Sequence, residues 1–213
     1  MVLHLVAALV IGHSVLGRPL RAYEVGNPKS PEKVLVVGCI HGNEPAGIPV
    51  VTRLERTHPS FDLWVIPTVN PDGCSAGTRQ NSHGVDLNRN FPSNWARIGK
   101  PGSYQYSGPH ALSEPETRAV VKFIRRIKPR ISIWYHQRQD LVRAWGQSIA
   151  VARRYARLSG MRFQAIRWPF GTAANWQNHA FPSTTSFVVE LPAGALSPAA
   201  VSRHVSAVLH IAQ

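Results

Sequence analysis

The sequence predicts a single α/β domain over residues 1–213, a three-layer α/β/α arrangement around a mixed, largely parallel twisted sheet. Short, continuous apolar runs are typical of strands that are buried on both faces of a parallel sheet, and they alternate here with segments of helical length. A length of 213 residues suits one domain. The sequence contains no internal repeat and no low-complexity tract that would divide it.

The first 26 residues are expected to form a hairpin. Residues 1–10 are interpreted as an apolar edge strand, which a turn at residues 14–18 pairs with a strand at residues 20–25. The competing interpretation is a signal segment, because residues 1–10 have the length of its apolar part. No Lys or Arg precedes them, however, and no clear cleavage site follows. The compartment therefore stays open between the cytoplasm and secretion.

The next elements come from apolar runs and turn residues. Residues 33–40 (KVLVVGCI) form a continuous apolar run and predict a strand buried on both faces. Residues 45–58 predict a helix, and residues 63–69 predict a second buried strand despite Pro67. The stretch from 70 to 108 is rich in Asn, Gly, Ser and Pro and shows no periodicity. A structureless region of that length inside a domain is usually functional.

The second half of the chain continues the alternation. Ser113 and Glu116 are expected to form a capping box that opens a helix over residues 114–127. The other expected elements are strands at 131–135 and 185–189, a helix at 148–159, and a final helix that Ser197 and Pro198 begin and that runs towards residue 210.

Charge and composition exclude several classes of protein. The chain carries 24 basic and 11 acidic residues, a formal charge of +13. Such a surface attracts polyanions, but without a Lys/Arg run or a nucleic-acid motif we expect no specific nucleic-acid partner. No apolar run approaches the roughly 20 residues that a membrane span needs. Two cysteines, Cys39 and Cys74, cannot make a four-cysteine zinc site. A metal would be held by histidines and carboxylates.

Ligands in sheets of this kind bind beyond the carboxyl ends of the strands. The first buried strand runs into His41 and Glu44, a later strand runs into His136, and the last strand runs into Glu190. Two histidines and one glutamate form a ligand set typical of catalytic zinc, which keeps a further position open. His136 is the natural third ligand beside His41 and Glu44. Its rivals are three histidines in loops: His83, His110 and His179.

Three further residues carry chemistry. Glu190 follows an apolar run, and a carboxylate in such a setting costs desolvation unless it has a partner or a task. Beside a metal it would act as a general base. Arg79 and Arg89 lie in the long loop, and a guanidinium suits a carboxylate or a developing oxyanion. Composition alone would make either arginine a solvated surface charge.

Taken together, these residues resemble the zinc carboxypeptidase family typified by pancreatic carboxypeptidase A. The matching segments occur in the family's order: HGNE at 41–44, NPDG at 70–73, GVDLNRNFP at 84–92, His136, and FVVEL at 187–191. In its short length and in the residues of these segments, the chain is most similar to the bacterial members of the murein peptide amidase type. The resemblance implies a carboxypeptidase-like fold.

The resemblance also implies roles for the catalytic groups. One zinc ion per chain would be held by His41, Glu44 and His136, and Glu190 would be the base that activates the attacking water. Arg79 would polarise the scissile carbonyl. The implied activity is a zinc-dependent metallocarboxypeptidase, a hydrolase for the peptide bond next to a free C-terminal carboxylate.

Asn88 and Arg89 would, by the same resemblance, hold the terminal carboxylate of a peptide or muropeptide substrate such as γ-D-glutamyl-diaminopimelate. Digestive members of the family have a mobile tyrosine about twenty residues before the catalytic glutamate. Residues 165–172 contain Trp168 and Phe170 in that window but no tyrosine. That window therefore offers no phenol that could cap the substrate.

Two alternatives stay open. N-acyl-amino-acid deacylases of the aspartoacylase and succinylglutamate desuccinylase type also carry HGNE and a DLNR run, but the NPDG segment, Asn90 and the FVVEL segment favour the peptidase. A catalytically inactive peptide-binding relative is the second alternative. A dead relative usually loses at least one of the four metal and base residues, and all four are present here.

Specificity is predicted from an acid-free segment. Between Asp140 and Glu190 lie 49 residues with six arginines and no Asp or Glu. A pocket for Lys or Arg needs a buried carboxylate, so such a preference is not expected. Arg167 could instead meet an acidic group such as the extra carboxylate of diaminopimelate. The alternative is a plain hydrophobic pocket made by Trp168, Phe170 and Trp176.

Overall fold

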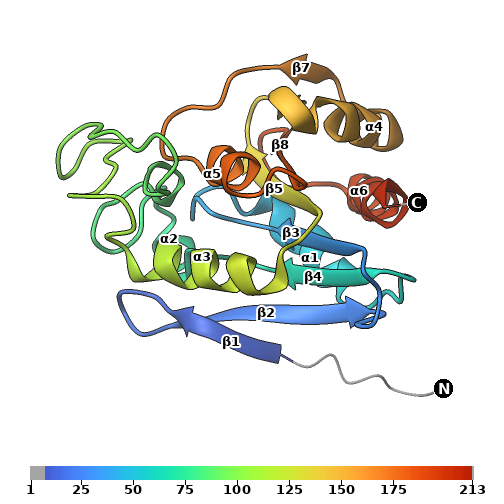
Figure 1. The fold of residues 1–213 in the computed structure, drawn as a ribbon. Coiled ribbons are helices and arrows are strands. Elements are labelled where there is room, and N and C mark those ends of the chain that lie inside the picture. The colour runs from blue at the N-terminus through green and yellow to red at the C-terminus, as the bar shows by residue number, and fades with distance from the viewer. Residues whose placement is uncertain (1–7, 213) are drawn as a thin grey trace.

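Eight strands form one sheet in residues 8–212, the part of the chain that the computed structural model describes (Figure 1). Four of the seven strand pairings in these residues are parallel, which confirms the mixed, largely parallel sheet expected from the sequence. In spatial order the strands are β1 (Ala8–His13), β2 (Pro19–Gly26), β4 (Asp62–Ile66), β3 (Lys33–Val37), β5 (Ile131–Gln137), β8 (Thr185–Leu191), β6 (Leu141–Ala144) and β7 (Phe163–Ala165).

Helices cover both faces of this sheet, as Figure 1 shows. One face is covered by α1 (Ile48–Leu54), α4 (Ile149–Ser159) and α6 (Pro198–Ile211), and the other by α3 (Pro115–Ile127) and α5 (Ala173–Ala180). The remaining helical segments are α2 (Pro71–Ala76) and three 3-10 turns, η1 (Pro45–Gly47), η2 (Leu87–Arg89) and η3 (Gly146–Ser148). No helix between residues 8 and 212 is long and apolar enough to cross a membrane.

The two faces of the sheet carry separate hydrophobic clusters. Along β3, Val34 and Val36 belong to the cluster beneath α1, α4 and α6, whereas Leu35 and Val37 belong to the cluster beneath α3 and α5. Successive side chains of a strand point to opposite faces, and here both faces are buried. This explains why the strand reads as a continuous apolar run rather than as an alternating one.

The N-terminal hairpin is present where the structure describes it. β1 pairs with β2 in antiparallel register, and β2 pairs in turn with β4. Gly12 of β1 lies directly beneath α3, where a Cβ atom added to it would lie 2.5 Å from Cβ of Ala119. The part of the expected strand that falls on residues 1–7 lies outside the described residues.

Several elements differ from those expected in their bounds or caps; β3, for example, ends at Val37 rather than at residue 40. The helix predicted over residues 45–58 is a 3-10 turn followed by α1, which ends at Leu54. β4 ends at Ile66, because Pro67 has no N–H to donate to the sheet. The capping box before α3 is wrong: Glu114 is the N-cap residue, and the Ser113 hydroxyl donates to the Glu114 carboxylate at 2.6 Å instead of capping the helix.

Candidate active site

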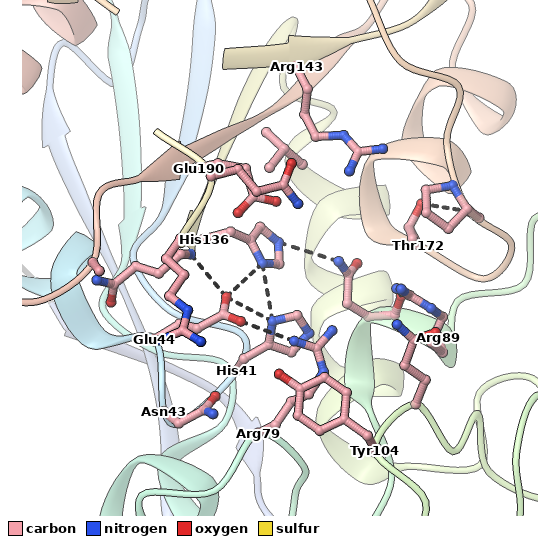
Figure 2. Close-up of a pocket in the computed structure, with 18 of the residues that line it drawn as sticks. His41, Asn43, Glu44, Arg79, Arg89, Tyr104, His136, Arg143, Thr172 and Glu190 are labelled. Carbon is pink, nitrogen blue, oxygen red and sulfur yellow. Dashed lines mark hydrogen bonds and ion pairs between the residues drawn. The ribbon is translucent and has the colours of Figure 1, made fainter. Parts of the chain in front are cut away.

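Four of the predicted site residues lie together at one edge of the sheet. β5 and β8 are parallel neighbours, and His136 lies directly opposite Glu190 in their register. Each is the last residue but one of its strand, whereas the sequence placed each just after the strand. The loop after β3 adds His41 and Glu44. All four line a cavity of about 540 Å³ (Figure 2).

His41, Glu44 and His136 bring three ligand atoms to one point. Oε2 of Glu44 lies 2.9 Å from Nδ1 of His41 and 3.1 Å from Nδ1 of His136, and the two Nδ1 atoms are 3.2 Å apart. Ligand atoms about 2.0–2.1 Å from a tetrahedral zinc ion are separated by about 3.4 Å. The triangle formed by these atoms therefore fits zinc in size, and its nitrogen and oxygen donors fit zinc in chemistry.

The rival histidines lie elsewhere. Within residues 8–212, His41, Glu44 and His136 form the only group of three or more His, Cys, Asp or Glu side chains that lie close enough together to hold a metal. His83 hydrogen-bonds Glu114 at 2.8 Å, outside this group. The other two rivals bond backbone carbonyls: His110 and His179.

A fully buried carboxylate behind the cavity connects the ligand residues. Oδ1 of Asp86 accepts from Nε2 of His41 at 3.0 Å and from the backbone N–H of Asn88 at 2.9 Å. Its Oδ2 accepts from Nε and Nη2 of Arg79, both at 2.9 Å, and Nη1 of Arg79 donates to Oε1 of Glu44 at 3.0 Å. Asp86 thus orients His41 and also fixes the guanidinium that contacts Glu44.

Sequence reasoning gave Asp86 no role, although it belongs to the matched GVDLNRNFP segment. The signal that could have found it was an acidic residue between two apolar ones in a chain with few acids. Burial raises the pKa of Asp86, but the neighbouring charge and hydrogen bond of His41, together with Arg79, outweigh burial and hold this pKa well below its usual value. The residue stays ionised and can balance the charge of His41 and Arg79.

The candidate ligands shift each other's pKa values. Burial raises the pKa of the Glu44 carboxyl, but hydrogen bonds from His136 and His41 outweigh burial and bring this pKa well below its usual value. For His41, burial lowers the pKa, and the charges of Asp86 and Glu44 raise it above the ordinary value. Glu44 therefore stays ionised, as a carboxylate that binds a cation must.

Glu190 carries an unused acceptor. The residue is 7% exposed, and its Oε2 atom is buried without a hydrogen-bond partner among residues 8–212. Buried polar atoms in folded proteins are nearly always paired, so an unpaired one calls for an explanation. In Figure 2 the carboxylate faces the same space as His136 and Glu44, where a ligand can reach it.

Arg79, Asn88 and Arg89 line the same cavity. Three of the five N–H groups of Arg79 are engaged by Glu44 and Asp86, which leaves two available. The Asn88 amide is held at both ends: its Oδ1 accepts from the N–H of Ala173 at 3.0 Å, and its Nδ2 lies 3.3 Å from Nε2 of His136. The structure brings together all three of the predicted residues.

The specificity residues are placed differently from the expectation. Arg167 is exposed and does not line the cavity. Its guanidinium carbon lies 5.2 Å from the ring centroid of Trp145, on which it stacks. Of the three aromatic residues proposed as a hydrophobic pocket, only Trp168 lines it; Trp176 belongs to the core and Phe170 is 55% exposed.

Among the lining residues that were not foreseen are Tyr104 and Arg143. Tyr104 stands at the mouth, with its ring centroid 4.7 Å from the guanidinium carbon of Arg79 (Figure 2). Arg143 extends from β6 into the cavity wall. Neither position carried a signal in the sequence, because one lies in a loop without periodicity and the other in a four-residue strand that was not predicted.

Sequence comparison identifies relatives of known type. The family model "zinc carboxypeptidase" matches residues 3–161. Murein peptide amidase A of Escherichia coli K12 is 37% identical over 142 residues, which cover 59% of this chain and 57% of the relative. Carboxypeptidase B of Bos taurus is 33% identical over 153 residues, which cover 57% of this chain and 37% of the relative. The chain therefore matches little more than half the length of the amidase and just over a third of the length of carboxypeptidase B.

Structure comparison extends the likeness to residues beyond 161. The murein-tripeptide amidase of Escherichia coli O157 has a TM-score of 0.77 at 26% identity, covering 97% of this chain and 91% of that chain. Bovine thrombin-activatable fibrinolysis inhibitor has a TM-score of 0.82 at 21% identity, covering 98% and 90%, and shows likeness of fold alone.

Proposed function

The chain belongs to the zinc carboxypeptidase family, and from this we propose that it is a zinc-dependent hydrolase that cleaves the peptide bond next to a free C-terminal carboxylate. One observation carries the proposal. Three convergent ligand atoms, an unpartnered glutamate and two arginines all line a single cavity of about 540 Å³. This combination provides a metal site, a base and anion-binding groups within reach of one substrate.

His41, Glu44 and His136 would hold the zinc ion, because their donor atoms fit it in number, type and spacing. When bound, zinc supplies Lewis acidity, which polarises a carbonyl and makes water a stronger acid. Asp86 keeps His41 oriented for this role through its hydrogen bond to Nε2. The neighbouring carboxylate also raises the basicity of the imidazole.

Glu190 serves as the general base. Its unpartnered Oε2 accepts a proton from the attacking water and then returns that proton to the leaving amine. The two unused N–H groups of Arg79 donate to the carbonyl oxygen as negative charge develops on it. A donor of this kind typically contributes about 3–4 kcal/mol to the stability of the transition state.

Asn88 and Arg89 bind the terminal carboxylate of the substrate. Both side chains line the cavity, and Nη1 of Arg89 donates to the Asn88 carbonyl at 2.8 Å, which fixes the two relative to each other. Requirement for this carboxylate makes the enzyme a carboxypeptidase. The DLNRNFP segment that supplies both residues, together with the family match, favours this activity over the N-acyl-amino-acid deacylase alternative.

The proposed substrate is a murein peptide that contains γ-D-glutamyl-diaminopimelate. Two relatives are named as amidases of murein peptides. The murein peptide amidase A of Escherichia coli K12 is 37% identical to this chain over the aligned sequence, and the murein-tripeptide amidase of Escherichia coli O157 is 26% identical over the structurally matched residues. The only carboxylates that line the cavity in residues 8–212 are Glu44 and Glu190, so no further one is present to pair with a substrate Lys or Arg.

A side-by-side assay tests this function. The zinc-loaded protein is incubated with murein tripeptide, a Phe-terminated peptide and a Lys-terminated peptide, and release of the terminal residue is measured with and without a chelator. We expect chelator-sensitive cleavage that is fastest for the murein tripeptide. Best activity on the Lys-terminated peptide would refute the charge argument, and no cleavage of any of the three would refute the carboxypeptidase function.

A further inference from the structure

One wall of the cavity carries an arginine that the proposed reaction does not use. Arg143 of β6 lies opposite Val188 of β8 in the antiparallel register, two residues along β8 from Glu190. Residues two apart in a strand share a face, so Arg143 and Glu190 are on the same face of the sheet. In Figure 2 the guanidinium of Arg143 extends into the space bordered by Glu190 on one side and Thr172 on the other.

Within residues 8–212, no carboxylate lies at ion-pair distance from Arg143, although the charge of Glu190 acts on it from further away. Arg79, which lines the same cavity, forms ion pairs with Glu44 and Asp86, whereas Arg143 forms none with any residue from 8 to 212. Nη2 of Arg143 donates to the backbone carbonyl of Arg167 at 3.2 Å. A backbone carbonyl is a neutral acceptor, so this hydrogen bond does not neutralise the charge of the guanidinium.

Two hydrogen-bond donors beside each other in this wall are unsatisfied. Nε of Arg143 and Nε1 of Trp168 are both buried without an acceptor among the described residues. The guanidinium carbon lies 5.8 Å from the Trp168 ring centroid, so the two side chains pack together. Burial lowers the pKa of Arg143, while the charge of Glu190 raises it in part. A bound anion would offset this desolvation of the guanidinium and supply acceptors to the wall.

The other charged groups of the cavity already have tasks. Its two carboxylates are Glu44 and Glu190, which the proposed function assigns to the metal and the base. Arg89 takes the terminal carboxylate of the substrate. Arg138 also lines the cavity, but it is exposed and its charge is screened by solvent. Arg143 is thus the half-buried cation that remains for a second negative group.

We propose that Arg143 determines specificity by pairing with a carboxylate in the side chain of the substrate's C-terminal residue. The chemical class selected is an acidic terminal residue, such as glutamate, or a diamino diacid with a second carboxylate. This inference rests on the proposed carboxypeptidase function. Arg143 thereby takes the role that the sequence had suggested for Arg167, which stacks outside the cavity.

A different role would be to stabilise the charge of Glu190 across the strand pair. That role affects every substrate equally, because Glu190 acts on all of them. Pairing with the substrate affects only substrates that carry the second carboxylate. The ratio of kcat/KM between two substrates that differ only in that charge separates the two roles.

The test uses two blocked dipeptides that end in Glu and in Gln, which match in shape. We expect the zinc-loaded wild type to prefer the Glu-terminated substrate about 10- to 100-fold in kcat/KM, as a charge-assisted contact provides. Arg143→Gln should bring this ratio close to one, and Arg143→Lys should keep part of it. Arg167→Gln is the matched control, and its ratio should equal that of the wild type.

A binding measurement keeps the test independent of turnover. In zinc-loaded protein that carries Glu190→Gln, the dissociation constants of the two dipeptides should differ by a similar factor, and adding Arg143→Gln should remove the difference. No preference for Glu over Gln in the wild type, or a ratio that Arg143→Gln leaves unchanged, overturns the inference. Equal losses on both substrates with a shifted pH profile overturn it in favour of the role through Glu190. Failure to cleave any peptide refutes the proposed function instead, and binding still decides the role of Arg143.

Discussion

Replacing Asp86 by asparagine tests how strongly the buried carboxylate supports the metal site. Each oxygen of Asp86 accepts two hydrogen bonds, from His41 and Asn88 at Oδ1 and from two nitrogens of Arg79 at Oδ2. An asparagine keeps one acceptor oxygen, so two of the four bonds become contacts between donors. Breaking a buried charge pair costs about 3–5 kcal/mol, and we expect that loss in the free energy of unfolding of the metal-free protein.

The same substitution should weaken zinc binding about 10- to 100-fold, because the partner that orients His41 is impaired. Urea unfolding and competition with a chelating dye at pH 7 measure the two effects. Asp72→Asn is the matched control: Asp72 is also buried and paired with an arginine, Arg18, but its partners are in the β1–β2 turn. It should destabilise the protein and leave zinc affinity unchanged. Wild-type zinc affinity in Asp86→Asn would refute the reasoning.

Three further substitutions have defined outcomes. Glu190→Gln should retain zinc and substrate binding and lower kcat by about 100- to 10,000-fold, because it removes the base; near wild-type turnover would make Glu190 structural. Gly42→Ala should lower both zinc affinity and Tm, since its Cβ would lie 1.9 Å from the backbone of Gly73 and overpacking costs about 1–3 kcal/mol or more; an unchanged Tm contradicts this close contact. The ring of His204 is hydrogen-bonded to the Tyr155 hydroxyl, and burial lowers the pKa of His204 from 6.5 to about 4. The free energy of unfolding that this neutral histidine allows is fully present above pH 6.5, and it is lost as the pH falls towards 4. This loss reaches about 3 kcal/mol, and urea unfolding of metal-free wild type and His204→Gln at pH 7 and 4.5 should show it only in the wild type.

The sequence predicted the central strands and the site at their ends because both follow from local patterns. A run such as KVLVV is buried on both faces wherever it occurs in a parallel sheet, and the residue types just past such runs meet at one edge. The final helix was also predictable, since Ser197 accepts from the N–H of Ala200 as a cap residue does. These features need no knowledge of distant contacts.

Other elements gave signals too weak or too ambiguous to recognise. β6 and β7 have four and three residues, and α5 begins at Ala173 without a side-chain cap. The α2 helix lies in the stretch of residues 70–108 where no regular element was expected, although Asn70 accepts from the N–H of Gly73 and Pro71 is the first helical residue. A turn and the first turn of a short helix share this pattern, and only the packing that follows distinguishes them.

Side-chain direction explains the errors within the site. Arg143 and Arg167 belong to the same acid-free, arginine-rich segment, so composition treats them alike. Register decides between them: Arg143 is paired with Val188 on the face that carries Glu190, whereas Arg167 follows β7 and stacks outside the cavity. The register of an edge strand depends on its neighbours in the sheet, which a single sequence does not reveal.

The most direct test of the central claim, a zinc site built by His41, Glu44 and His136, is the zinc content of the purified protein and of its His136→Ala variant, measured by elemental analysis after equilibration with limiting free zinc. The three convergent ligand atoms predict one zinc ion per chain in the wild type and a large loss in the variant, with Glu190→Gln still holding one. Equal zinc content in the wild type and His136→Ala would contradict the ligand assignment and the hydrolytic function that rests on it.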